Sequence, residues 1–238
     1  MRWAAVHYWV GTPRHVHVVL TRERGSNDSL ASWLPDGVTV SEVPLTMTRF
    51  YDSDEVLEEL KGCDEFGKYR ALVVTSARSA LYVTLARSAL SPGGRVVSVG
   101  SATARALEID DLASDVVGEG GAMDLLREID EGPVLILGAA TMRPGLALAL
   151  KARGITVTTL TCYETVPAVL SDHDEAELRR ADVVFIGAPS AWKVAVSFVG
   201  VDTWVVVPGT TTGEYVGRDH ARVIEGWGSE LREHLRAL

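Results

Sequence analysis

Short apolar runs alternate with amphipathic segments along the whole chain. Most of these runs are rich in Val, Ile and Leu and contain few polar positions, as in strands that are buried on both faces of a parallel sheet. The predicted strands are residues 16–22, 38–43, 71–75, 95–99, 115–118, 133–137, 156–161, 182–186, 204–207 and 221–224. Because helical patterns separate them, the chain is predicted to be an α/β protein with mainly parallel sheets.

The segments between the predicted strands contain signals for the beginning and end of helices. Asp52 stands three residues before Glu55, which is the spacing of a capping box. Gly154 stands where a glycine would end the helix before it, and Ser229 precedes a helical pattern over 230–238. These signals predict one helix after Asp52, one ending at Gly154 and one at the C-terminal end of the sequence.

The sequence also repeats itself loosely. Residues 69–83 resemble residues 180–194, and residues 95–107 resemble residues 203–216. The two pairs are separated by almost the same number of residues. The repetition therefore predicts two similar α/β halves.

The turns that follow the predicted strands consist mostly of small or hydroxyl-bearing residues. In open α/β sheets ligands bind at this edge, where helix N-termini present free N–H groups that suit carboxylate or phosphate. The alternative is that these Ser, Thr and Gly residues only cap helices. The candidate binding residues in the turns are Thr75, Ser76, Gly100, Ser101, Thr103, Gly121, Gly138, Ala188, Ser190, Gly209, Thr211 and Thr212. Three nearby arginines could each clamp a carboxylate or could be solvated surface residues: Arg22, Arg78 and Arg143.

Composition and charge restrict the possible partners. The chain has 238 residues and a formal net charge of −9, which opposes binding to nucleic acid or to an anionic membrane. The acidic runs at 52–65 and 172–177 indicate solvated helix faces. No apolar run is long enough to span a membrane, and residues 1–15 are expected to form an extension rather than a signal peptide.

Several kinds of site have no counterpart in the sequence. Cys63 and Cys162 lie far apart, so neither a zinc site nor a disulfide framework is expected and a reducing cytoplasm is the expected location. The sequence contains no GxGxxG, no GxxxxGK[ST] and no GxSxG motif, which disfavours nucleotide binding and the usual hydrolase chemistry. We therefore expect no metal site.

The motifs together resemble the uroporphyrinogen-III synthase family. That family has a first strand ending in Thr-Arg, an F-T-S-P-R-A-like turn, a V-G-x-x-T-A turn that opens a helix and a small G-G-A turn. It also has a strand–Arg–helix–strand segment ending in V-Y-x-T and a second turn of the form G-x-T-T. The matching segments here are VVLTR at 18–22, VVTSARSA at 73–80, VGSATA at 99–104, GGA at 120–122, VLILGAATMRPGLALALKARGITVTTLTCYET at 134–165 and GTTT at 209–212.

The resemblance implies two α/β domains joined by two extended segments. The first domain would comprise residues 1–42 and 169–238, and the second residues 51–157. The connecting segments would be 43–50 and 158–168. The substrate would be hydroxymethylbilane, a linear tetrapyrrole with eight carboxylates, which the enzyme closes with loss of water and inversion of its last ring. The resemblance implies no metal and no organic cofactor. A monomer is expected, with transient contact to hydroxymethylbilane synthase.

The resemblance also assigns the candidate residues to roles. Tyr163 stands in C-Y-E-T, where the family has V-Y-x-T, and its phenol could hydrogen-bond the departing hydroxyl as a catalytic group. The alternative is a packed tyrosine whose hydroxyl is tied to the backbone. The turn residues and arginines named above would bind the substrate.

One turn departs from the family pattern. At 185–190 two of the family's hydroxyl groups are missing. This departure keeps open an alternative function, a non-catalytic domain of the same fold that senses a tetrapyrrole or a small anion. A third hypothesis for the function is a general two-domain protein that binds small molecules.

Overall fold

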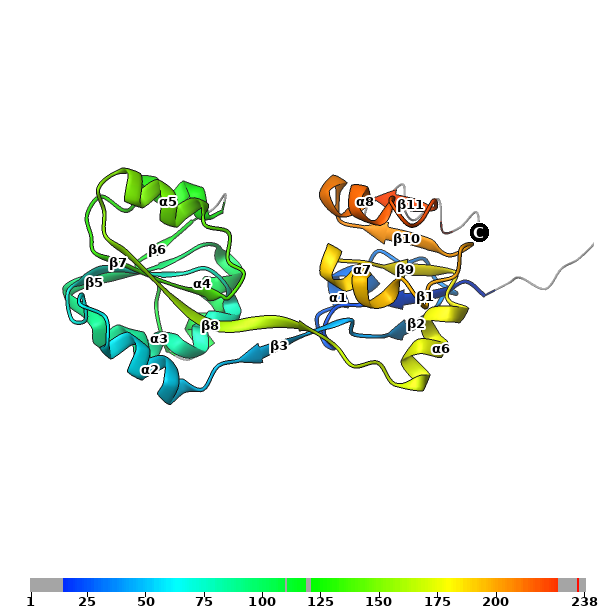
Figure 1. The fold of residues 1–238 in the computed structure, drawn as a ribbon, viewed down its shortest axis with the longest axis horizontal. Coiled ribbons are helices and arrows are strands. Elements are labelled where there is room, and N and C mark those ends of the chain that lie inside the picture. Colours follow the sequence, from blue (N-terminus) through cyan, green and yellow to red (C-terminus); the bar gives the residue numbers. More distant parts are fainter. Residues whose placement is uncertain (1–14, 110, 119–120, 227–234, 236–238) are drawn as a thin grey trace, which may run out of the picture. The chain divides into compact units, whose positions relative to one another are not determined.

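The computed structural model describes residues 15–109, 111–118 and 121–226 and Leu235 (Figure 1). By its contacts the chain divides into two compact units. Unit 1 is Met1–Met47 with Val166–Leu238, and unit 2 is Thr48–Thr165. Each unit is a largely parallel sheet with helices on both faces, so the predicted fold class is confirmed. The expected extension lies outside the described residues apart from His15, and the helix expected over 230–238 does so apart from Leu235.

Unit 1 contains a five-stranded parallel sheet in the order β11-β10-β9-β1-β2. Its strands are β1 (His17–Leu20), β2 (Thr39–Glu42), β9 (Val183–Phe185), β10 (Trp204–Val207) and β11 (Val223–Glu225). Its helices are α1 (Asp28–Ala31), α6 (Asp172–Arg180), α7 (Pro189–Ala195) and α8 (Thr210–Val216).

The sheet of unit 1 buries side chains on both faces because neighbouring strand residues point in opposite directions. Val19 and Val184 pack on one face against helices α6, α7 and α8, with Trp192 as the largest buried side chain. Leu20 and Phe185 pack on the other face with α1. Burial on both faces explains why these strands are nearly continuous apolar runs in the sequence.

Unit 2 contains a six-stranded sheet in the order β3-β8-β7-β4-β5-β6. Its strands are β3 (Thr46–Phe50), β4 (Tyr69–Val74), β5 (Leu90–Ser98), β6 (Val116–Val117), β7 (Val134–Ala139) and β8 (Val157–Pro167). Its α-helices are α2 (Ser53–Lys61), α3 (Val83–Ala86), α4 (Ser101–Ile109) and α5 (Gly145–Ala152). Shorter 3₁₀ segments are η1 (Ala77–Tyr82), η2 (Arg87–Ala89) and η3 (Ala122–Arg127).

The sheet of unit 2 also has two packed faces. Leu72 and Leu135 lie in the cluster beneath α2, α3 and α4, whereas Val73 and Ile136 lie in the cluster beneath α5 and η3. From α5 the side chain of Leu150 is fully buried in the second cluster. Helix α5 is therefore held against the same face of the sheet from which the alternate residues of β7 project.

The repeat in the sequence corresponds to a repeat in the topology. In unit 1, β9 lies between β1 and β10, and in unit 2, β4 lies between β7 and β5. The similar segments 69–83 and 180–194 contain β4 and β9, and the segments 95–107 and 203–216 begin around β5 and β10. The prediction of two similar α/β halves is confirmed.

Local signals place several helix ends correctly. The Asp52 carboxylate accepts hydrogen bonds from the backbone N–H groups of Asp54 and Glu55, at 2.8 and 3.3 Å, and so caps α2. The complete capping box occurs instead at α6, between Ser171 and Asp174. Gly154 has a φ of +79° just after α5, as expected for the glycine that ends a helix.

The segment 43–50, expected only as a connection, contains the strand β3. Its residues Thr46–Phe50 include two threonines and an arginine and form no apolar run, so the pattern that identified the other strands is missing. The strand is held by its pairing with the long strand β8, which fills most of the other expected connection, 158–168.

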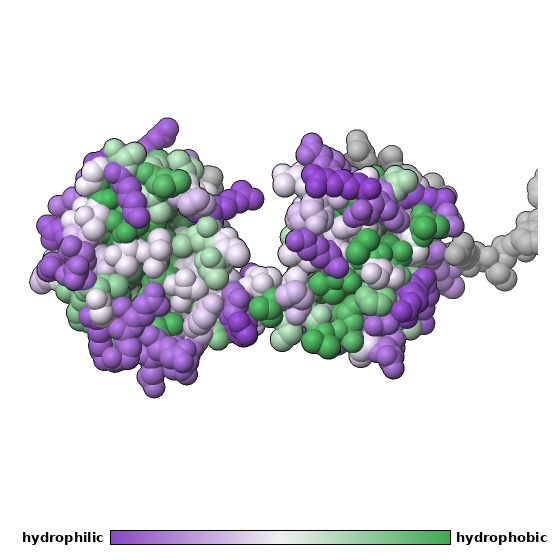
Figure 2. All heavy atoms as spheres, in the orientation of Figure 1, coloured by the Kyte–Doolittle hydropathy of each residue, from purple (hydrophilic) through white to green (hydrophobic). Residues whose placement is uncertain are grey.

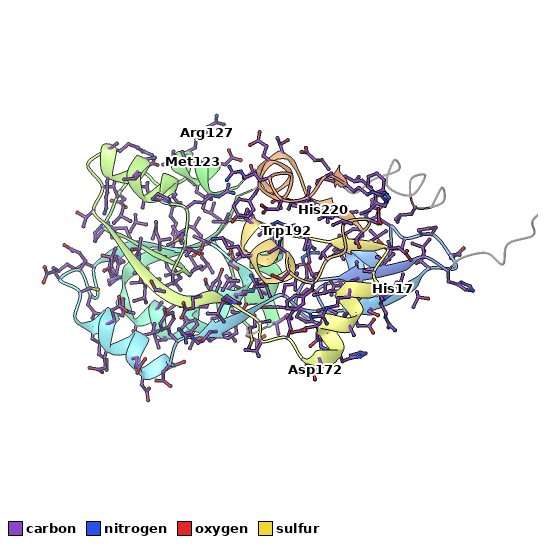
Figure 3. All side chains as sticks on the ribbon, turned by 45° about the vertical axis from the view of Figure 1, so that its right-hand side comes forward. His17, Met123, Arg127, Asp172, Trp192 and His220 are labelled. Atoms are coloured by element: carbon purple, nitrogen blue, oxygen red, sulfur yellow. The ribbon has the colours of Figure 1, made fainter. Side chains whose placement is uncertain are left out.

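The prediction that the acidic run at 172–177 forms a solvated helix face is wrong at one position. The side chain of Glu177 is buried, with a relative exposure of 2%. It accepts hydrogen bonds from Ser41 and Arg180, and its Oε2 lies 3.2 Å from Nε2 of His17, which lies on β1 beside α6 (Figure 3). Burial opposes ionisation, but these hydrogen bonds and the charges of Arg180 and His17 prevail, so the pKa of Glu177 is lowered. A carboxylate buried beneath α6 is stable here because donors surround it.

Candidate active site

In unit 2 the carboxyl ends of parallel strands meet at one edge of the sheet. Thr75 directly follows β4, Ala139 ends β7, and Tyr163 is the residue of β8 that pairs with Ala139. The backbone N–H and the hydroxyl of Thr75 both donate to the carbonyl oxygen of Leu137, at 3.2 and 2.8 Å. The N–H of Ala140 donates to the carbonyl oxygen of Tyr163 at 2.8 Å. Strand-to-strand bonds therefore fix the backbone around these side chains.

A cavity of about 470 Å³ opens at this edge, between α5 and strands β7 and β8. Its apolar lining includes Ile136 and Leu146, which are buried, and Leu148, which is exposed. Hydrophobic side chains are visible over α5 in Figure 2, whereas hydrophilic ones dominate over α2. The polar lining is made by Thr75, Arg143, Lys151, Thr159, Thr161 and Tyr163.

The lining of this cavity is positively charged. It contains the two cations Arg143 and Lys151 and no acidic residue. Within the described ranges, no carboxylate makes an ion pair with either side chain. In a chain with a net charge of −9, such a site is a local region of positive potential that favours an anionic ligand.

Tyr163 lies at the junction of the cavity and the hydrophobic core. It is 6% exposed, and its ring centroid lies 6.2 Å from that of Phe50. The guanidinium carbon of Arg78 lies 5.9 Å from the centroid of the same ring, within the range of a cation–π contact. Contacts with Phe50 and Arg78 hold the ring in place while it contributes to the lining.

The hydroxyl of Tyr163 differs from those of its neighbours. Tyr69 donates to Thr158 at 2.8 Å, and Tyr82 donates to the backbone oxygen of Tyr51 at 2.6 Å. Burial raises the pKa of Tyr82, and it raises the pKa of Tyr69 to about 12. For Tyr163, in contrast, the described part of the chain supplies no hydrogen-bond partner to the phenol oxygen. Its hydroxyl is available to a ligand in the cavity.

The cysteine next to Tyr163 is chemically inert. Cys162 is fully buried, and burial raises the pKa of its thiol to about 12. At neutral pH this thiol is protonated, and the thiolate is the form that attacks electrophiles and binds metals. The site therefore offers no cysteine nucleophile.

Three of the expected site residues of unit 2 line the cavity: Thr75, Arg143 and Tyr163. The others lie in turns at or near the same edge but outside the lining: Ser76, Arg78, Gly100, Ser101, Thr103, Gly121 and Gly138. Ser76 accepts a hydrogen bond from the N–H of Arg78 at 3.2 Å and so caps η1. Thr103 is 6% exposed. For Ser76 the structure supports the capping role that was the alternative to ligand binding.

Gly138 has a packing role of its own. A Cβ atom at this position would lie 2.5 Å from Sδ of Met142 and 2.8 Å from Oγ1 of Thr75. Both of these residues line the cavity. The absence of a side chain at Gly138 therefore leaves room for Met142 and Thr75 in the lining of the cavity.

The expected site residues of unit 1 follow the ends of its own strands. Arg22 comes after β1, Ala188 and Ser190 come after β9, and Gly209, Thr211 and Thr212 come after β10. Ser190 and Thr211 are exposed, whereas Thr212 is 5% exposed. In unit 1, too, the turns gather at the carboxyl edge of a parallel sheet.

Three cavity residues were missed in the sequence: Lys151, Thr159 and Thr161. Thr159, Thr161 and Tyr163 are separated by two residues each, the period of a strand, so the exposed face of β8 could have been extended from the tyrosine. Lys151 lies in the last turn of α5 and has no motif of its own.

Other kinds of site are not found in the described ranges. In them, no three His, Cys, Asp or Glu side chains are grouped so that they could hold a metal ion. No helix in the same ranges has the length and apolarity needed to cross a membrane.

Comparison with known proteins decides the family. A model of the family described as Uroporphyrinogen-III synthase HemD matches residues 35–224, which is most of the chain. The chain belongs to this family. The matched residues include the cavity of unit 2 and the strand-end turns that follow β4, β5, β7, β9 and β10. A search of curated proteins gives no match.

Solved structures of uroporphyrinogen-III synthases have a similar fold. The enzyme from Helicobacter pylori is 17% identical, with a TM-score of 0.60 over 93% of this chain and 98% of that chain. A mutant enzyme from Thermus thermophilus is 16% identical, with a TM-score of 0.54 over 93% and 96%. These likenesses agree with the two-unit α/β architecture expected for the uroporphyrinogen-III synthase family.

Proposed function

We propose that this chain is a uroporphyrinogen-III synthase, which converts hydroxymethylbilane into uroporphyrinogen III. The reaction removes the terminal hydroxyl as water, joins the resulting carbon to the substituted carbon of the last ring, and inverts that ring. Substrate and product plus water have the same composition, so no oxidant, reductant or cofactor is needed. The observation that carries the proposal is the cavity lined by two cations and no acid beneath an available phenol, in a chain of this family.

The electrostatics of the cavity support a polycarboxylate substrate. Arg143 and Lys151 have no acidic partner in the described ranges, so a carboxylate bound there would not have to displace one. Arginine can hold a carboxylate with two parallel hydrogen bonds. The net charge of −9 opposes long-range attraction of the substrate, and the local cations act where the ligand is already close.

Tyr163 is the proposed catalytic residue. Its phenol would donate a hydrogen bond to the departing hydroxyl and help it to leave as water. The packed ring beside Phe50 and Arg78 keeps the hydroxyl in place, so little conformational freedom is lost when the substrate binds. Because the substrate loses its hydroxyl readily, positioning contributes more of the outcome than acid catalysis does.

The remaining assignments belong to the same proposal. The turn residues of both units, including Arg22, Ser190 and Thr211, would bind further carboxylates. The two units would act as domains joined through 43–50 and 158–168. The protein would act as a cytoplasmic monomer that receives its substrate during transient contact with hydroxymethylbilane synthase.

The isomer of the product tests the proposal. The substrate is generated in a coupled assay with hydroxymethylbilane synthase, and the porphyrinogens are oxidised and separated by chromatography. Uncatalysed closure gives the non-inverted type I isomer, so an active enzyme yields mostly type III. Type I alone would refute the proposal, and tetrapyrrole binding without type III product would favour the non-catalytic alternative.

The role of Tyr163 is tested by Tyr163→Phe, which removes only the hydroxyl. We expect kcat to fall by about tenfold or more. This is a small effect for a general acid, because the leaving group departs readily. Tyr69→Phe is the matched control, since it removes a hydroxyl of unit 2 that bonds Thr158 outside the cavity. Equal kcat values for the two variants would assign Tyr163 to positioning alone.

A further inference from the structure

One side of the cavity is formed by a continuous face of α5. Pro144, Ala147, Leu148 and Lys151 all line it, at the spacing i, i+3, i+4 and i+7 that puts residues on one helical face. The opposite side includes Thr159 and Thr161 from β8. The helix and the strand thus flank a slot that is lined by two cations, Arg143 just before α5 and Lys151 in its last turn.

Within the described ranges, no hydrogen bond or ion pair involves four polar side chains of this slot: Arg143, Lys151, Thr159 and Thr161. Lys61 and Lys68 are ion-paired with Glu58 and Glu65, and Arg153, two residues after Lys151, approaches Asp130 at 3.7 Å. Lys151 makes no such pair there, although it lies in a chain with an excess of acidic residues. The hydroxyls of Thr159 and Thr161 likewise have no hydrogen bond from any described residue.

We propose that this slot binds one complete pyrrole ring of the substrate and that Lys151 binds one of the two carboxylates on that ring. Arg143 binds the other carboxylate, and a threonine hydroxyl of β8 accepts the hydrogen bond of the pyrrole N–H. The inference rests on the proposed function and adds to it a residue and a ligand subsite in unit 2.

Size and polarity agree with this occupant. The cavity volume of about 470 Å³ exceeds what a single substituted pyrrole needs and is within the range of small-ligand sites. Buried Ile136 and Leu146 provide an apolar surface for the flat ring, which lacks charge of its own. The acetate and propionate chains on neighbouring ring carbons place two negative charges on one side of the ring, and the slot offers two cations and no acid.

The test uses a single pyrrole that carries one acetate and one propionate chain, titrated calorimetrically into the full-length protein. We expect saturable binding that weakens as ionic strength rises. Lys151→Gln should weaken it by about tenfold, because a hydrogen bond to a charged group is lost. Lys61→Gln is the matched control, since Lys61 also lies in the last turn of a helix of unit 2 but pairs with Glu58 outside the cavity.

The outcomes separate this inference from the proposed function. Unchanged affinity in Lys151→Gln, or no saturable binding of the probe to the wild-type protein, overturns the subsite even if type III product is formed. Type I product alone, with probe binding that depends on Lys151, overturns the proposed reaction and keeps the site. With the full substrate, Lys151→Gln should raise KM by about tenfold and leave the isomer ratio unchanged at saturation. A lower kcat at unchanged KM would contradict the binding role.

Discussion

The buried carboxylate of Glu177 should contribute strongly to the stability of unit 1. It connects α6 to the sheet, because it accepts hydrogen bonds from Ser41 of β2 and from Arg180 and faces His17 of β1. The variant Glu177→Gln keeps the size of the side chain and removes its charge. The amide keeps one acceptor oxygen but places an NH2 donor where the second carboxylate oxygen accepted a hydrogen bond, in a site already filled by donors.

The expected loss follows from the exposure of each partner. Hydrogen bonds to a charged group contribute about 1.5–3 kcal/mol when they are buried. Glu177 is 2% exposed and the side chain of His17 is 10% exposed, so this part of the network has nearly its full value. The side chain of Arg180 is 62% exposed, so its bond is weakened by solvent and contributes about 1 kcal/mol or less. We expect Glu177→Gln to lower the free energy of unfolding of unit 1 by about 2 kcal/mol.

Tryptophan fluorescence measures this quantity for unit 1 alone. All six tryptophans of the sequence fall in the ranges of unit 1, and Trp192 is almost fully buried there. A urea titration followed by tryptophan emission therefore reports unfolding of unit 1 without a signal from unit 2. Glu175→Gln is the matched control on the same helix. Its ion pair with Arg179 is more exposed, and we expect a loss of at most about 0.5 kcal/mol.

The pH dependence supplies a second check. The pKa of Glu177 is lower in the folded protein than its ordinary value, so its ionisation stabilises the fold above the unfolded-state pKa of about 4.3. That stabilisation is lost as the pH falls through the folded-state pKa. The difference between wild type and Glu177→Gln should be full at pH 7 and shrink below about pH 4. Equal losses for both variants at pH 7, or a difference that grows on acidification, would refute this reasoning.

Two further predictions concern the surroundings of the cavity. Gly138→Ala should raise KM and lower the free energy of unfolding by about 1 kcal/mol, because its Cβ would meet Met142 and Thr75. The stability is measured by a urea titration followed by circular dichroism, with Gly187→Ala as the control, where a Cβ meets nothing within 4 Å. An unchanged KM, or the same effect from the control, would contradict the prediction. In the folded protein at pH 8, a thiol reagent should modify Cys63 and leave Cys162 unreacted, because Cys162 is buried and its pKa is raised to about 12; rapid modification of both thiols would contradict this picture.

The fold could be predicted where burial determined the sequence. Strands such as β7 and β10 are apolar at nearly every position because both faces of their sheets are covered, and the run itself is the signal. Strand β3 has no such run, since its order comes from pairing with β8. Glu177 was misread for a related reason, because helical spacing does not reveal that donors from β1 and β2 lie beneath one position of α6.

Only the part of the candidate site that lies in sequence motifs could be predicted. Thr75, Arg143 and Tyr163 belong to motifs of the uroporphyrinogen-III synthase family and line the cavity. Lys151, Thr159 and Thr161 reach it because α5 and β8 border the same cavity, an arrangement in space that no local pattern encodes. Ser76 lies in a predicted turn, but its hydroxyl caps η1.

The isomer composition of the product tests the central claim most directly. Hydroxymethylbilane is supplied at a fixed concentration while the concentration of this protein is raised, and the fractions of type I and type III porphyrin are measured after oxidation. The fraction of type III should rise with protein concentration until type III dominates, and Tyr163→Phe should need more protein to reach the same fraction. A product that stays type I at every protein concentration would contradict the claim.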